Sequence, residues 1–82
     1  MTTASSDEPV LDARGLRCPE PVMLLHNRVG ELAPGAVLQV WATDPSTERD
    51  ITRFCQFLGH ELLDAETEGE VFCFRVRKRP EG

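Results

Sequence analysis

Arg14-Gly15-Leu16-Arg17-Cys18-Pro19-Glu20-Pro21-Val22-Met23-Leu24-Leu25 is the stretch that decides how this 82-residue chain folds. Proline is tolerated in the first turn of a helix, where the backbone N–H has no partner in any case. Two prolines followed by apolar residues therefore predict a helix that begins at Pro19 and places Cys18 at the N-cap. Unpaired backbone donors and the helix dipole favour a thiolate there. We therefore expect a reactive, accessible sulfur.

Neighbouring charges act on this thiol in both directions. Arg17 favours the thiolate, whereas the carboxylate of Glu20 raises the pKa of a nearby thiol. On balance we expect the pKa of Cys18 to be lowered modestly. A free cysteine is more often a buried structural residue, but a junction of loop and helix that Pro19 and Pro21 hold rigid is an exposed position.

Outward from this stretch, hydrophobic periodicity predicts strands at 10–13, 37–43, 62–67 and 71–78 and a helix at 19–33. It predicts a second helix that is opened by Asp44-Pro45, with Asp44 or Ser46 as its N-cap and Gly59 as its C-cap. A tight turn at Glu68-Gly69 joins the last two strands. The β-α-β-α-β-β order predicts a two-layer α/β sandwich, with two helices on one face of a four-stranded mixed sheet and water on the other face. We expect a disordered tail at 1–9 and one domain at 10–79.

Composition excludes several classes of protein. The formal net charge of −5 repels nucleic acid, and no stretch approaches the roughly 18 apolar residues of a membrane span. The polar N-terminus does not resemble a signal peptide, so we expect a cytoplasmic protein. Three cysteines cannot all pair within the chain, and their spacing matches no zinc site. We expect no metal and no cofactor.

The chemistry open to Cys18 is narrowed by what surrounds it in the sequence. A Cys-x-x-Cys dithiol would need a second cysteine where Pro21 stands. A cysteine hydrolase would need a histidine base, and His26 is about 12 Å away along the helix. A lone reactive cysteine without base or dithiol is typical of a carrier protein. In such a protein a group is attached to the cysteine sulfur and is then transferred to another protein. Cys55, in a helical core stripe, and Cys73 are interpreted as structural.

Apolar residues near Cys18 predict where a partner docks. Met23 and Leu24 leave apolar surface within two turns of the thiol. The charged rim of this surface is expected to consist of Arg17, Glu20, Arg28 and Asp44.

Two other functions stay open. Trp41 with Arg75, Arg77 and Lys78 could form a nucleic-acid platform on the open sheet face, although a solvated face with one packed ring is the stronger interpretation. A regulatory protein that signals through the redox state of Cys18 is the other alternative.

The string from Leu11 to Met23, with its Cys-Pro-x-Pro motif, resembles the signature of the TusA family of sulfur carriers, also called SirA-like proteins. The segments 42–51 and 54–57 resemble the family's second block. The resemblance implies a β-α-β-α-β-β sandwich whose Cys18 takes a persulfide from a pyridoxal-phosphate cysteine desulfurase. We expect the chain to be a monomer. The resemblance also implies delivery to an acceptor such as a DsrE-like relay, toward 2-thiouridine at the tRNA wobble position (s2U in mnm5s2U). Molybdenum-cofactor synthesis and dissimilatory sulfur oxidation are the alternative destinations.

Overall fold

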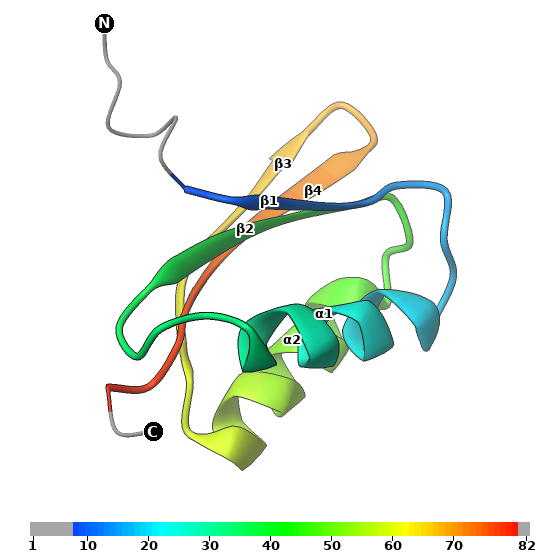
Figure 1. Ribbon diagram of the computed structural model, residues 1–82. Helices are drawn as coiled ribbons and strands as arrows, with labels where there is room; N and C mark the ends of the chain where they lie inside the picture. Colours follow the sequence, from blue (N-terminus) through cyan, green and yellow to red (C-terminus); the bar gives the residue numbers. More distant parts are fainter. Residues whose placement is uncertain (1–7, 81–82) are drawn as a thin grey trace, which may run out of the picture.

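The chain folds into two layers, as Figure 1 shows. The computed structural model describes residues 8–80. Its strands are β1 (Val10–Ala13), β2 (Val37–Ala42), β3 (Glu61–Glu68) and β4 (Val71–Arg77), and its helices are α1 (Glu20–Gly30) and α2 (Thr47–Leu58). Both helices lie against one face of the sheet (Figure 1). The predicted two-layer sandwich and the order of its elements are confirmed.

The sheet is mixed, with the strand order β1-β2-β4-β3. β1 and β2 are parallel, and both other pairs are antiparallel. In the parallel pair Ala13 lies beside Ala42, so both strands end at the same edge of the sheet. The loop to α1 and the loop to α2 therefore start side by side (Figure 1). This topology brings Cys18 to the beginning of α2.

The core lies between the sheet and the helices. In β2 the side chains alternate, with Leu38, Val40 and Ala42 buried and the residues between them half-buried. Such a two-residue period is expected of a strand with one face in the core and one face in water. The predicted helical stripes supply the opposite side, with Leu25, Val29, Ile51 and Cys55 all buried.

The predicted limits of α1 are wrong at both ends. The helix begins at Glu20, so Pro19 occupies the N-cap and Cys18 precedes it by one residue. The Glu20 N–H donates to the carbonyl of Arg17 at 2.8 Å, which closes a turn across the cis Cys18–Pro19 peptide bond before helical bonding starts. At the other end the helix stops at Gly30 rather than Ala33, and a tighter turn follows in which Leu32 N–H donates to Val29.

One of the two expected N-caps of the second helix is confirmed, because α2 begins at Thr47 and Ser46 is its N-cap. The turn between the last two strands differs by one residue. Glu68 pairs with Val71, so the hairpin loop is Gly69-Glu70 rather than Glu68-Gly69. The C-cap of α2 at Gly59 is confirmed, with φ at 81° and an N–H that donates to the carbonyl of Cys55.

The N-terminal edge of the described chain already contacts the sheet. Gln39 N–H donates to the carbonyl of Pro9 at 2.9 Å. Of the tail predicted for residues 1–9, positions 1–7 lie outside the described residues and positions 8 and 9 are described. Neither helix within residues 8–80 is long and apolar enough to cross a membrane.

Candidate functional site

Cys18 is exposed and lies on a loop that is tied to the start of α2. Its backbone N–H donates to Oδ2 of Asp44 at 2.7 Å, and the N–H of Gly15 donates to Oγ1 of Thr43 at 2.9 Å. The other oxygen of Asp44 accepts from both the N–H and the hydroxyl of Ser46 at 3.0 Å. Asp44 therefore joins the Cys18 loop to the first turn of α2 and fixes the sulfur in space.

The electrostatic environment of Cys18 differs from the prediction. The pKa of the Cys18 thiol is raised above its ordinary value, chiefly by the Asp50 carboxylate, which lines the same hollow as the thiol. Desolvation and the negative charges of Asp50 and Asp44 act in the same direction, and the Ser46 hydroxyl opposes them. The predicted lowering of this pKa is wrong. The carboxylates responsible come from α2 and the loop before it, not from Glu20.

The position of α1 explains why its dipole does not dominate. Cys18 precedes the N-cap, and most positions in the first turn of α1 offer it no free backbone N–H. The Glu20 N–H binds Arg17, the Met23 N–H binds the carbonyl of Pro19 at 3.1 Å, and Pro21 has no N–H. A helix terminus with so few free donors stabilises an adjacent anion weakly.

An apolar hollow of about 340 Å³ opens beside the sulfur on the α2 side. Phe57 forms one wall and is 88% exposed, which is unusual for an aromatic side chain. The other residues that line the hollow are Cys18, Pro19, Val22, Asp50, Arg53 and Phe54. A hydrophobic surface directly beside a reactive atom suits contact with another protein.

The predicted exposure of Met23 and Leu24 is confirmed. Met23 is 58% and Leu24 38% exposed, and both line a second hollow of about 350 Å³ together with Leu16, Glu20 and Asn27. Arg28 lies in the last turn of α1, at the end of the helix remote from Cys18. Asp44 binds the Cys18 loop instead of the rim of this surface. Pro21 is buried, so it supports the turn from inside.

The other two cysteines are separated from Cys18. Cys55 is buried in α2, and burial raises the pKa of its thiol to about 11. Cys73 lies on β4 and is half-buried. Its sequence neighbours Phe72 and Phe74 lie on the opposite face of the strand, toward the helices. Burial and the nearby carboxylates of β3 raise the pKa of the Cys73 thiol. Of the three cysteines, Cys18 is the most exposed.

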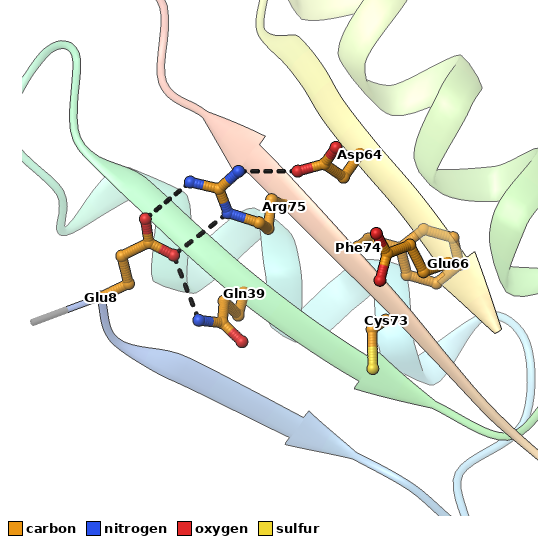
Figure 2. Close-up of a pocket in the computed structure, with 7 residues that line it drawn as sticks. All are labelled: Glu8, Gln39, Asp64, Glu66, Cys73, Phe74 and Arg75. Atoms are coloured by element: carbon orange, nitrogen blue, oxygen red, sulfur yellow. Dashed lines mark hydrogen bonds and ion pairs between the residues drawn. The ribbon is translucent and has the colours of Figure 1, made fainter. Parts of the chain in front are cut away.

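The open face of the sheet carries ion pairs rather than free cations. Figure 2 shows Arg75 between two carboxylates, with 2.8 Å to Glu8 and 2.6 Å to Asp64. Arg77 pairs with Glu61, and the ammonium of Lys78 donates to the carbonyl of Leu32 at 2.7 Å. Basic side chains that are already paired offer little to phosphates, because counterion release needs free positive charge. This face does not favour the nucleic-acid platform.

Sequence reasoning missed the contribution of α2 to the site. Asp50, Arg53 and Phe57 lie outside the apolar stripe that identifies this helix, so their side chains were unassigned. Phe57 carried a signal, because a phenylalanine off the core stripe of an amphipathic helix must be exposed. Asp50 carried none, since a carboxylate in the first turn of a helix is common.

Comparison with known proteins identifies the class to which this fold and this cysteine belong. The family described as "Sulfurtransferase TusA" matches residues 10–78. The chain is 57% identical over 74 residues to the "Sulfur carrier protein TusA" of Pseudomonas aeruginosa, covering 90% of this chain and 94% of the relative. It is 54% identical over 77 residues to that of Pseudomonas putida, covering 94% of this chain and 96% of the relative.

Structural comparison agrees with the sequence. The crystal structure of a SirA-like protein from Desulfitobacterium hafniense superposes with a TM-score of 0.76, covering 85% of this chain and 96% of that one at 21% identity. The two chains therefore share a fold. This protein belongs to the TusA family of sulfur carriers.

Proposed function

We propose that Cys18 accepts a sulfane sulfur as a persulfide from a cysteine desulfurase and passes it to a cysteine of an acceptor protein. The observation that carries the proposal is the exposed position of this single sulfur on a turn fixed by Asp44, while Cys55 is buried and Cys73 lies on β4. A second thiol close to Cys18 would discharge the persulfide as an internal disulfide. The fold provides a sulfur carrier without that side reaction.

The transfer is a thiol–disulfide type of exchange. The Cys18 sulfur attacks the terminal sulfur of the donor persulfide, a bond forms between these two atoms, and the donor's S–S bond breaks. The electron pair of the broken bond stays on the donor cysteine, which takes up one proton. Cys18 loses one proton, so the step is balanced and involves no net oxidation. Discharge repeats the same step with Cys18 as the donor. The acceptor cysteine attacks the terminal sulfur of the Cys18 persulfide, and Cys18 takes up the proton that the acceptor thiol loses.

The surface around Cys18 supports partner docking. Phe57 and Val22 provide apolar area in one hollow, and Met23 and Leu24 provide it in the other. Pro19 lines the first of these hollows, and Glu20 lines the second. Arg17 is exposed in the same loop. Such a partly apolar patch with a charged rim is typical of transient protein interfaces.

Loading is tested by intact mass spectrometry after incubation with a cysteine desulfurase and L-cysteine. We expect the wild type to gain the mass of one sulfur atom, which a reductant removes. Cys73→Ser should be loaded equally, and Cys18→Ser should not be loaded. A gain that persists undiminished in Cys18→Ser, or no gain in the wild type, would sink the proposal.

The destination that we propose is a DsrE-like acceptor and 2-thiouridine at the wobble position of tRNA, in the cytoplasm. Sulfur supply to the molybdenum cofactor or to dissimilatory sulfur oxidation would use the same Cys18 chemistry with another acceptor. Nucleoside analysis of tRNA from a deletion strain separates these routes. We expect 2-thiouridine to fall and to be restored by the wild-type gene but not by Cys18→Ser. An unchanged level of 2-thiouridine would contradict the tRNA route and would favour one of the other two acceptors.

A further inference from the structure

The carboxylate of Asp50 and the sulfur of Cys18 line the same hollow, although 32 positions separate them in the chain. Asp50 belongs to the first turn of α2, and its side chain is only 17% exposed. Partial burial strengthens the interaction of a charge with its neighbours, because little water screens it. The position of Asp50 is therefore suited to act on the state of Cys18.

Other groups near the sulfur are less able to take this role. Both oxygens of Asp44 already accept hydrogen bonds, from the Cys18 N–H and from Ser46. Those bonds lower the pKa of the Asp44 carboxyl, so it contributes a fixed negative charge at neutral pH. The charged neighbours Arg17 and Glu20 are exposed.

The remaining polar groups near Cys18 and Asp50 are a hydroxyl and two cations. The hydroxyl of Ser46 can donate to a thiolate and so favours the opposite state of Cys18. Arg53 lines the same hollow but is exposed, and Arg49 lies 3.5 Å from the Asp50 carboxylate with more than half of its side chain exposed. Solvent screening weakens both cations relative to Asp50.

We propose that Asp50 is a positioning residue that accepts a hydrogen bond from the Cys18 thiol and holds it protonated in the free carrier. The proposal rests on the sulfur-carrier function proposed above and adds a control of its reactive atom. The raised pKa of Cys18 is consistent with this geometry. The thiolate is the form that oxidants and electrophiles attack. Asp50 would therefore protect the unloaded carrier between encounters with its partners.

The proposal has a direct consequence for transfer. Cys18 attacks the donor persulfide as a thiolate, so its proton must leave the Asp50 hydrogen bond first, and the donor thiolate that is released takes up one proton in exchange. The loading rate should then rise with pH as Cys18 ionises. Removal of the Asp50 charge should move that rise to lower pH without removing any atom that reacts.

The test measures the rate of Cys18 alkylation by iodoacetamide against pH, in a Cys73→Ser background so that one exposed sulfur remains. Asp50→Asn should move the midpoint of this pH dependence, at which half of Cys18 is ionised, to lower pH. Because a less basic thiolate is also a weaker nucleophile, a tenfold larger thiolate fraction should give alkylation near neutral pH about threefold faster. Glu20→Gln is the matched control, since it removes a carboxylate near the turn, and it should leave the midpoint unchanged.

Two further measurements keep the proposal falsifiable. If Asp50→Asn does not fold, the pH midpoint of Cys18 alkylation is measured for the wild type in buffer and in urea. A midpoint in the folded protein that is equal to or lower than the midpoint in the unfolded protein overturns the proposal. In folded Asp50→Asn, a midpoint equal to that of the wild type also overturns it. Loading by a cysteine desulfurase is followed against pH in parallel. A wild type that is never loaded defeats the sulfur-carrier proposal, while the alkylation midpoints still decide the role of Asp50.

Discussion

The three cysteines show that environment, rather than residue type, sets the chemistry of a thiol. Cys18 is exposed beside two carboxylates, Cys55 is enclosed by the core, and Cys73 is half-buried next to β3. All three thiol pKa values are raised, but the physical causes differ. For Cys18 the first cause is the Asp50 carboxylate, whereas for Cys55 and Cys73 it is burial. Access therefore distinguishes Cys18 from the others.

Cys55 should be inert in the folded protein. With its pKa at about 11 and its side chain buried, very little thiolate is present or reachable near neutral pH. We expect Cys18 to be alkylated by iodoacetamide at about pH 8 while Cys55 stays unmodified, as read by peptide mass spectrometry. Urea should expose Cys55 to the same reagent. Equal labelling of Cys18 and Cys55 without urea would contradict the packing described here.

At the scale of the residue, the sequence predicted the exposed position of Cys18 but not the direction in which its pKa is shifted. Cys18 was located by the two prolines that follow it, which is a local signal. The residues that raise its pKa come from 26 and 32 positions away along the chain, and no local pattern connects them to it. Contacts between single side chains that are far apart in the chain depend on tertiary packing, so local sequence patterns do not predict them.

At the scale of the element, local chemistry predicted more. The apolar stripes identified both helices, and strand alternation identified all four strands of residues 8–80. The errors lie at helix ends, because a side chain or a competing turn decides each terminus. The Arg17–Glu20 turn delayed the start of α1, and the Asp44 contacts with Ser46 precede the start of α2.

Gly59 should be required for the end of α2. Its φ of 81° lies in the left-handed region, where a side chain costs about 1 to 2 kcal/mol. Gly59→Ala should therefore lower the free energy of unfolding by about 1 kcal/mol in urea denaturation. Gly30→Ala is the matched control. Gly30 ends α1 without a positive φ and with open space at its Cβ position, so alanine there should stabilise by about 0.5 kcal/mol. Equal effects of the two changes would refute this account of the helix ends.

At the scale of the whole molecule, the parallel pairing of β1 with β2 builds the site. It brings the ends of two strands together, so that the loop of Cys18 meets the loop before α2. The two layers then divide the surface by function. The helix side carries Cys18 and the apolar hollows, and the open sheet face carries the Arg75 ion pairs (Figure 2).

Folding stability should decrease from neutral toward acidic pH in two stages. Burial, with Arg79 and Lys78 nearby, lowers the pKa of His60, so the unfolded chain takes up a proton first as the pH falls below 6.5. Partners also hold carboxyl pKa values low, with Arg75 acting on Glu8 and Arg14 bringing the pKa of Asp12 to about 2. Their stabilising effect is present above the unfolded pKa and is lost as the pH falls through the folded pKa.

Both stages have the same sign because the unfolded state binds more protons in each. We expect the melting temperature to be highest near neutral pH, lower at about pH 5.5, and lowest at about pH 3.5, as measured by circular dichroism. High salt should weaken the second stage more than the first, since screening acts on the exposed ion pairs. A melting temperature that is the same at all three pH values would contradict these assignments.

The sequence alone determined the order of the elements, the layered architecture and the exposed position of Cys18. These features follow from hydrophobic periodicity and from the backbone limits of proline, which act within a few residues. Only the tertiary structure decided the exact start of α1, the anchoring of Cys18 by Asp44, the neighbouring Asp50 and the hollow beside Phe57. Those features arise where segments far apart in the chain meet, and the geometry of their meeting is set by the packing of the helices on the sheet.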